Sequence, residues 1–279
     1  MAIYPWSPEE ACAMHLKMYA DRPRASRARR LLVVAGCTTA LVAVPLSAPA
    51  ATASAGNGIE DLSAREIADK ASDAFTSAQS VRVTLDENST DIGQGEVSSA
   101  DLTLDRDGNC NGSMRFKDSG NVELVKRGEQ VWLKADEKYW KTEVPGSEGE
   151  SAAEIFKNRY IRGSTDDSLL GDLAGVCDLK EIQQKAAEES RKAKDLRKGD
   201  PTTVDGTPAI PVSGMEEGVT HTVYVATEGK PYPVRTTKKG DGKDVTATFK
   251  DYDKPVPTET PSADESVDVS KLYEEVPTV

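Results

Sequence analysis

The period of the apolar residues is the feature that most limits how this chain can fold. From Val81 onward, apolar and polar residues alternate in short runs, and the clusters DRDGNCNG, KDSGN and KRGEQ separate several of these runs. Successive side chains of a strand point to opposite faces, so each run predicts a strand with one apolar and one wet face. The runs predict an antiparallel meander whose apolar face includes Val81, Val83, Leu85, Leu102, Leu104, Met114, Phe116, Leu124, Val131, Leu133, Val223, Val225 and Phe249.

Two other stretches have the longer period of a helix. Residues 61–79 place apolar side chains three to five positions apart, and Ser63 and Glu66 stand in the order of a capping box. The charged run KAAEESRKAKDLRKGD predicts a solvated helix face or loop, and the proline-rich tail after Lys254 predicts a crossing segment that ends in a short helix or a frayed end. The second helical stripe consists of Leu169, Leu170, Leu173, Val176, Leu179 and Ile182.

The stretch DGNCNGSMRFKD, from Asp107 to Asp118, has the donor spacing of a calcium-binding EF-hand loop. Oxygen donors stand at positions 1, 3 and 5, and Gly112 stands at position 6. An EF-hand needs a helix on each side, whereas this stretch lies between two alternating runs. Acidic residues and Asn-Gly are also typical of hairpin turns, so we interpret the stretch as a turn and predict no metal site.

The first 55 residues have the order of an export signal. Five arginines between Arg22 and Arg30 precede the apolar run LLVVAGCTTALVAVPLSAPAATASA, which ends in the small-residue site Ala53-Ser54-Ala55. Pro45 and Pro49 interrupt this run, which disfavours a membrane helix. Val34-Ala35-Gly36-Cys37 resembles a lipobox, so acylation of Cys37 is the alternative to cleavage near Ala55. We therefore divide the chain into residues 1–55, an extension with an export signal, and a domain at 56–279.

Charge and cysteine content narrow the possible partners and the compartment. The chain has a net charge of −12, and residues 1–55 hold six of its 35 basic and three of its 47 acidic residues, which leaves −15 for the remainder. Such a balance disfavours nucleic acid as a partner. Cys110 and Cys177 are the cysteines outside the signal, and in an oxidising compartment they predict one disulfide. A loop of 67 positions closed in this way stabilises the fold by about 4 kcal/mol.

The motifs of common enzymes are absent from the sequence. Residues 56–279 contain one histidine, His221, in an alternating run of threonines and valines, and they lack a Gly-x-Ser-x-Gly elbow, a P-loop, HExxH and CxxC. We interpret His221 as a strand residue and expect neither an enzyme nor a cofactor. A one-faced sheet covered by helices either has a filled core or leaves an apolar pocket under the helices.

Several phrases, in their order along the chain, resemble the LolA-like superfamily. They are DGNCNGSM, the predicted strand VWLKADEKYWK, the cysteine phrase LAGVCDL and the closing stretch GKPYPVRTTKKGDGKDVTATFKDYDKPVPTETPS, which follow a helix after the signal. Within that superfamily the sequence is similar to actinobacterial lipoproteins of the LppX/LprG glycolipid-binding group. The resemblance implies an α+β fold: an antiparallel β-sheet bent into a half-barrel, with helices covering its concave apolar face.

The resemblance also implies a function. Its members carry lipids, glycolipids or lipoproteins through the cell envelope, or sense them, without catalysis. It implies that the thirteen apolar-face residues named above contact acyl chains, and that the protein is an extracytoplasmic monomer whose partner is a lipid or an acylated ligand, with a membrane surface or another envelope protein as a further possible partner. The alternative is the same fold with a filled core that acts as an envelope sensor or a protein-interaction module.

Overall fold

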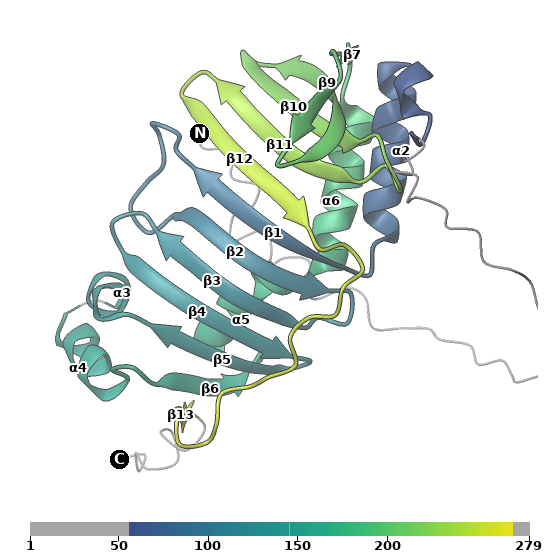
Figure 1. Cartoon of the computed structure of the whole chain (residues 1–279). Helices are drawn as coiled ribbons and strands as arrows, with labels where there is room; N and C mark the ends of the chain where they lie inside the picture. Colours follow the sequence, from purple (N-terminus) through teal and green to yellow (C-terminus); the bar gives the residue numbers. More distant parts are fainter. Residues whose placement is uncertain (1–55, 145, 270–279) are drawn as a thin grey trace, which may run out of the picture. The chain divides into compact units, whose positions relative to one another are not determined.

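The computed structural model describes residues 56–144 and 146–269, which form a large sheet with helices on one side (Figure 1). The predicted export signal, Cys37 and the end of the tail lie outside these residues. Among the described residues, no helix has the length and apolar character needed to cross a membrane. The strands are β1 (Ser80–Glu87), β2 (Val97–Asp105), β3 (Cys110–Phe116), β4 (Gly120–Arg127), β5 (Gln130–Ala135), β6 (Tyr160–Ser164), β7 (Arg197–Lys198), β8 (Thr202–Val204), β9 (Thr207–Glu216), β10 (Val219–Ala226), β11 (Pro233–Gly240), β12 (Lys243–Lys250) and β13 (Ser266–Asp268).

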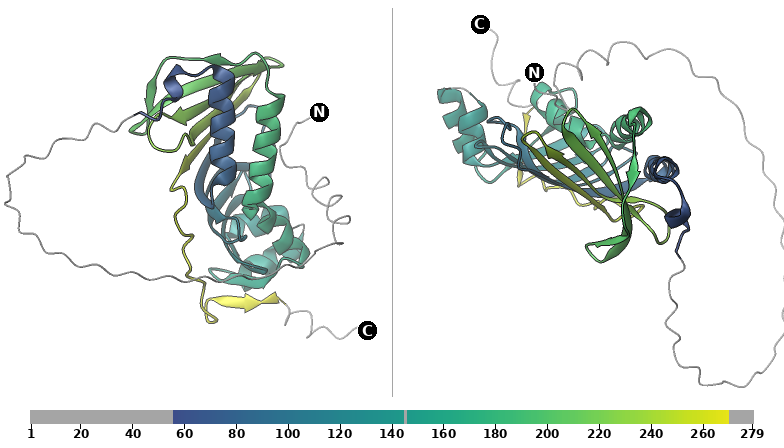
Figure 2. Two further views of the ribbon diagram at one scale, coloured as in Figure 1. Left: turned by 90° about the vertical axis from the view of Figure 1, so that its right-hand side faces the viewer. Right: turned by 90° about the horizontal axis from the view of Figure 1, so that it is seen from above.

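The strand order confirms the antiparallel meander. The order is β13-β6-β5-β4-β3-β2-β1-β12-β11-β10-β9-β7, with β8 also paired to β9. Every pair is antiparallel except β13 with β6, which run parallel. The pairing of β1 with β12 joins the first and last long strands of the chain, so the sheet is continuous from β6 to β9. This sheet curves around the helices on its concave side (Figure 2).

Two long helices lie side by side on that concave side (Figure 2). The capping box of Ser63 and Glu66 begins α2, as predicted, and α2 buries Ile67, Ala71, Ala74 and Phe75. The predicted second stripe is broken into α5, η2 and α6 rather than one helix, because Asp178 caps the start of a new helix through the backbone N–H of Glu181. The helices are η1 (Ile59–Asp61), α2 (Ala64–Ser77), α3 (Glu137–Glu143), α4 (Ser147–Ile155), α5 (Ser168–Ala174), η2 (Gly175–Cys177) and α6 (Leu179–Lys192).

Helices α2 and α6 satisfy each other's C-terminal carbonyl groups. The buried Gln183 amide of α6 donates hydrogen bonds to the carbonyls of Phe75 and Ala78 at 2.8 and 2.9 Å. In return, the Arg65 guanidinium of α2 donates to the carbonyls of Ser190 and Ala193. Because the last carbonyls of a helix lack partners within it, these bonds join the two helices into one antiparallel pair.

The predicted disulfide is present and ties the helical layer to the sheet. Cys110 is the first residue of β3, Cys177 is the last residue of η2, and their Cα atoms are 5.5 Å apart. The EF-hand-like stretch is the turn between β2 and β3 followed by β3 itself. The Asp105 carboxylate organises this turn by accepting bonds from the backbone N–H groups of Asp107 and Asn109.

The structure differs from the secondary structure predicted from the sequence in three places. The phrase VWLKADEKYWK is not one strand: β5 ends at Ala135, and α3 follows because the Asp136 carboxylate caps its N-terminus through the Tyr139 N–H at 2.8 Å. The short strand β13 was not predicted within the acidic tail, and β7 was not predicted within the charged run. The strand β13 depends on its pairing with β6, far away in the sequence, and β7 depends on its pairing with β9.

Candidate functional site

The sheet has a helix-facing side and an open side. Residues directly opposite in paired strands share a side, and every second residue of a strand does too. Cys110, Leu124 and Leu133 point toward η2, α5 and α6, whereas Arg82, Asp101 and Glu123 point to the other side. The helix-facing side is therefore the apolar side predicted from the alternation.

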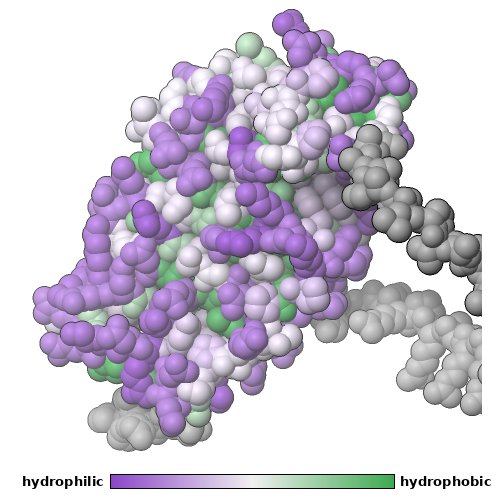
Figure 3. All heavy atoms as spheres, in the orientation of Figure 1, coloured by the Kyte–Doolittle hydropathy of each residue, from purple (hydrophilic) through white to green (hydrophobic). Residues whose placement is uncertain are grey.

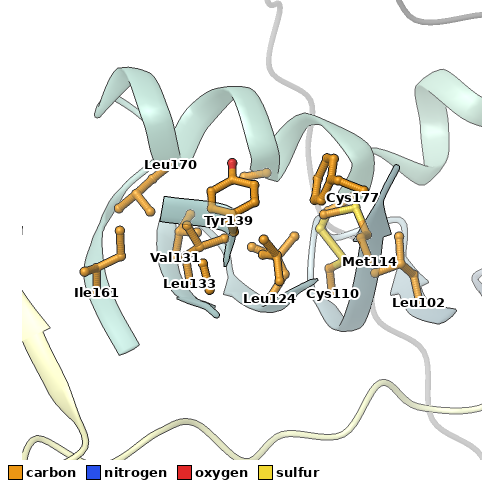
Figure 4. Packing of buried hydrophobic residues seen from close by; sticks show 14 of the residues in the cluster. Leu102, Cys110, Met114, Leu124, Val131, Leu133, Tyr139, Ile161, Leu170 and Cys177 are labelled. Atoms are coloured by element: carbon orange, nitrogen blue, oxygen red, sulfur yellow. A yellow bond between two sulfur atoms is a disulfide. The ribbon is translucent and has the colours of Figure 1, made fainter. Parts of the chain in front are cut away.

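Two separate core clusters fill parts of the helix-facing side. The first cluster packs Leu170, Cys177 and Leu179 of the helical layer onto β1 to β6, and Figure 4 shows Cys177 beside Met114 and Leu170 near Val131. The second cluster packs η1 and α2 onto β9 and β10, through Ile59, Ile67, Ala71, Ile210, Val212 and Val225. Between these clusters lie parts of β1, β12 and β11.

The thirteen predicted lining residues separate into two groups by burial. Four of them, Val83, Leu85, Val223 and Phe249, are only half-buried. Nine have at most 9% of their surface exposed and pack within the two core clusters: Val81, Leu102, Leu104, Met114, Phe116, Leu124, Val131, Leu133 and Val225. The half-buried residues are the better candidates for contact with a ligand, because a side chain already packed in a core has little surface to offer.

Two of the half-buried residues, Leu85 and Val223, belong to a continuous row across five strands. In this row, Leu85 of β1 stands opposite both Ala100 of β2 and Ala247 of β12, and Thr236 of β11 stands opposite both Ala247 and Val223 of β10. All five are half-buried, and we call the row the half-covered strip. Strands are spaced about 4.8 Å apart, so the strip extends roughly 19 Å, a length suited to an extended acyl chain.

The helical cover is loose near the strip. The buried residues of α6 are Leu179 and Gln183, both before the middle of the helix. Leu85 and Ala247 belong to neither core cluster, although Val83 and Phe249, each two positions away along its strand, pack against the first. Phe75 of α2 closes this side, with its ring centre 5.6 Å from that of Phe249. The strip is therefore apolar surface that the protein itself only partly covers.

The strip ends at two basic side chains. Lys238 of β11 stands directly opposite His221 of β10. Lys238 follows the strip residue Thr236 by two positions and His221 precedes Val223 by two, so both lie on the same side as the strip. Burial lowers the pKa of the His221 imidazole below its ordinary value of 6.5, and the positive charge of Lys238 lowers it further. Glu189 of α6 and Glu216 oppose this shift, which shows that the second half of α6 lies near His221.

The open side carries a groove of about 880 Å³. Its walls alternate in charge: Asp101 and Glu123 stand near Arg115 and Lys134, and the hydrogen bond from Arg82 lowers the pKa of the Asp101 carboxyl. Residues that alternate toward the helices, such as Val122, also line it, and so do Leu85 and Ala100 of the half-covered strip. Figure 3, which views the open side, shows mainly hydrophilic side chains with apolar residues visible between them. This groove has the polarity of a protein-contact surface rather than of an acyl-chain site.

Sequence patterns did not predict all residues of this site. Ala100 and Ala247 lie in the alternating runs, but alanine gives no signal of a ligand-contacting position. Only the pairing of β10, β11 and β12 places Thr236 in the strip and Lys238 beside His221 at its end. In the described part of the chain, no three His, Cys, Asp or Glu side chains are grouped closely enough to hold a metal ion.

The comparisons with known proteins define the class of fold. No protein-family model and no curated protein matches this sequence. Among solved structures, the chain shares the α+β fold that the resemblance implied. The particular structure that carries this conclusion is LprF from Mycobacterium bovis, at 14% identity and a TM-score of 0.51, over 72% of this chain and 97% of LprF. The lipoprotein LppX from Mycobacterium tuberculosis matches 70% of this chain and 98% of its own, at 14% identity and a TM-score of 0.47.

Proposed function

We propose that this protein binds the hydrocarbon chain of a lipid or an acylated ligand on the half-covered strip and carries it, without catalysis, in the bacterial envelope. The observation that supports this most directly is the row of half-buried residues from Ala100 to Val223, where the sheet is apolar and the helices cover it incompletely. The resemblance to a group of lipid carriers, and a sequence that begins with the order of an export signal, support the same proposal.

The physical basis of binding is the hydrophobic effect. Each methylene group transferred from water to an apolar surface contributes about 0.8 kcal/mol, so a long chain gains enough to offset its loss of freedom. Movement of the α2–α6 pair would admit the chain, because α6 has few buried anchors beyond Gln183. The disulfide at Cys177 holds the N-terminal end of α6 to β3 and limits how far that end can move.

Native mass spectrometry of the purified full chain tests this function. We expect a monomer that carries additional mass, which organic extraction removes and incubation with fatty acids restores. The same spectrum reports whether the signal is cleaved near Ala55 or whether Cys37 is acylated. A protein that has only its own mass after purification, and takes up no lipid afterwards, would contradict the proposal.

A protein-interaction module is the second candidate function. The open-side groove favours it, because mixed charge and exposed backbone are typical of surfaces that contact other proteins. The nine fully packed residues also favour it, since a filled core needs no ligand. This candidate predicts the negative result in the mass measurement above.

A further inference from the structure

The two basic residues at the end of the half-covered strip are well placed to bind a charged group. Residues directly opposite in an antiparallel pair have Cβ atoms about 5 Å apart, so the Lys238 and His221 side chains can reach one small ligand group together. Both are half-buried on the helix-facing side, where a charge is less screened than in open solvent. Within the described residues, neither side chain forms a hydrogen bond or an ion pair.

Among the described residues, no acidic side chain near this pair forms an ion pair with Lys238, so its ammonium group is available to a ligand. Glu87 lies in the same row but two strands away, beyond Val245, and its carboxylate accepts a bond from the Ser89 N–H at 3.0 Å. Glu189 and Glu216 act on His221 from α6 and from β9. The neighbouring basic residue Lys239 points to the open side and pairs with Asp244 at 3.1 Å. The lysine on the open side is therefore neutralised, whereas the one beside the strip is not.

The segment that follows α6 lies beside the pair on the β9 side. Gly214 of β9 stands directly opposite His221, and a Cβ at Gly214 would lie 3.1 Å from Leu196 Cδ2, so the segment after α6 crosses the sheet there. The Leu196 side chain therefore occupies the space above Gly214, beside His221.

We propose that Lys238 and His221 bind the anionic headgroup of an amphiphile whose hydrocarbon chain lies on the half-covered strip. This inference rests on the proposed function and names its ligand class: a lipid with a carboxylate or phosphate group at one end. An ammonium and an imidazole N–H both donate hydrogen bonds that an oxyanion accepts, and such charge-assisted bonds are stronger than neutral ones. A neutral headgroup would leave the lysine charge without a partner.

Ligands with one chain length and different headgroups test the assignment. Palmitate, hexadecyl phosphate and hexadecanol compete with a fluorescent apolar probe for the full-length protein. We expect both anions, or the one whose geometry fits, to bind about tenfold tighter than the alcohol. Lys238→Gln should remove this preference and leave the affinity for the alcohol unchanged. Lys239→Gln is the matched control, because it removes the same charge from the adjacent residue on the open side.

The possible results separate this inference from the proposed function. Equal affinity for all three ligands, or an equal loss for all three in Lys238→Gln, would overturn the headgroup assignment while the proposed function stands. If none of the three ligands binds, both the headgroup assignment and the proposed function are rejected. Tighter binding of hexadecyl phosphate than of palmitate, or the reverse, shows whether the headgroup that the site prefers is a phosphate or a carboxylate.

The ring of His221 gives a second and independent measurement. An oxyanion in contact with the imidazole favours its protonated form, so bound hexadecyl phosphate should raise the His221 pKa from its depressed value, and hexadecanol should not. Proton NMR titration of the ring measures this, and the variant His221→Gln identifies its signal among the two histidines of the chain. An unchanged pKa in the presence of saturating hexadecyl phosphate would contradict the assignment.

Discussion

Replacing both Cys110 and Cys177 with alanine is expected to lower the free energy of unfolding by about 4 kcal/mol. The bond closes a loop of 67 positions, and the reduced chain regains the conformational freedom that this closure removes. Both cysteines are fully buried in the first core cluster, so the alanines also leave unfilled space beside Met114 and Leu124. Denaturation in urea, extrapolated to water, measures the difference, and the melting temperature should fall by roughly 10 °C.

Reduced wild-type protein is the control for this experiment, because it lacks the bond but keeps both sulfur atoms in the core. A decrease of less than about 1 kcal/mol in the double variant would show that the loop is already constrained without the bond. The variant also tests the role of the disulfide in ligand exchange. Cys177 is only two residues before α6, so losing the tether should allow α6 to move further and should speed both uptake and release of lipid.

The second large effect is expected at Leu85. The replacement Leu85→Asp places a carboxylate in the middle of the half-covered strip, opposite Ala100 and Ala247. A polar group without a partner costs about 1–3 kcal/mol when an acyl chain covers it, so lipid affinity should fall by one to two orders of magnitude. Competition with a fluorescent fatty acid measures this affinity.

The matched control for Leu85 is Thr84→Asp, which adds the same charge to the same strand but on the open side. Thr84 lines the open-side groove and stands opposite Asp101. The Thr84→Asp variant should leave lipid affinity unchanged. Leu85 packs in neither core cluster, so its replacement should change the melting temperature only slightly. Equal loss of affinity in the two variants would show that the strip is not where the chain binds.

Local patterns were sufficient to predict much of this structure. The alternation from Val81 to Leu133 predicted β1 to β5, because a period of two is a property of the strand itself. The capping box of Ser63 and Glu66 predicted the start of α2 for a similar reason, since both partners lie within one turn. The disulfide followed from counting cysteines rather than from geometry.

The division of the apolar face into core and strip could not be predicted in this way. Leu85 and Leu133 have the same alternating pattern, yet Leu133 is fully buried in the first core cluster and Leu85 is half-buried. The difference arises because α5 packs on β5, whereas the buried residues of α6 end at Gln183. Coverage by a helix depends on contacts between distant parts of the chain. For the same reason, the sequence marked His221 as an ordinary strand residue and gave no indication of its neighbour Lys238.

The proposed function requires a hydrocarbon chain to lie between the two core clusters, and paramagnetic NMR with a nitroxide-labelled fatty acid tests this position. With the label in the middle of the chain, the methyl signals of Leu85, Ala247 and Val223 should broaden first. Those of Leu124 and Leu133, which lie within the first core cluster, should broaden much less. Equal broadening across the helix-facing side, or strongest broadening at open-side methyls such as those of Thr84 and Thr248, would contradict the proposed site.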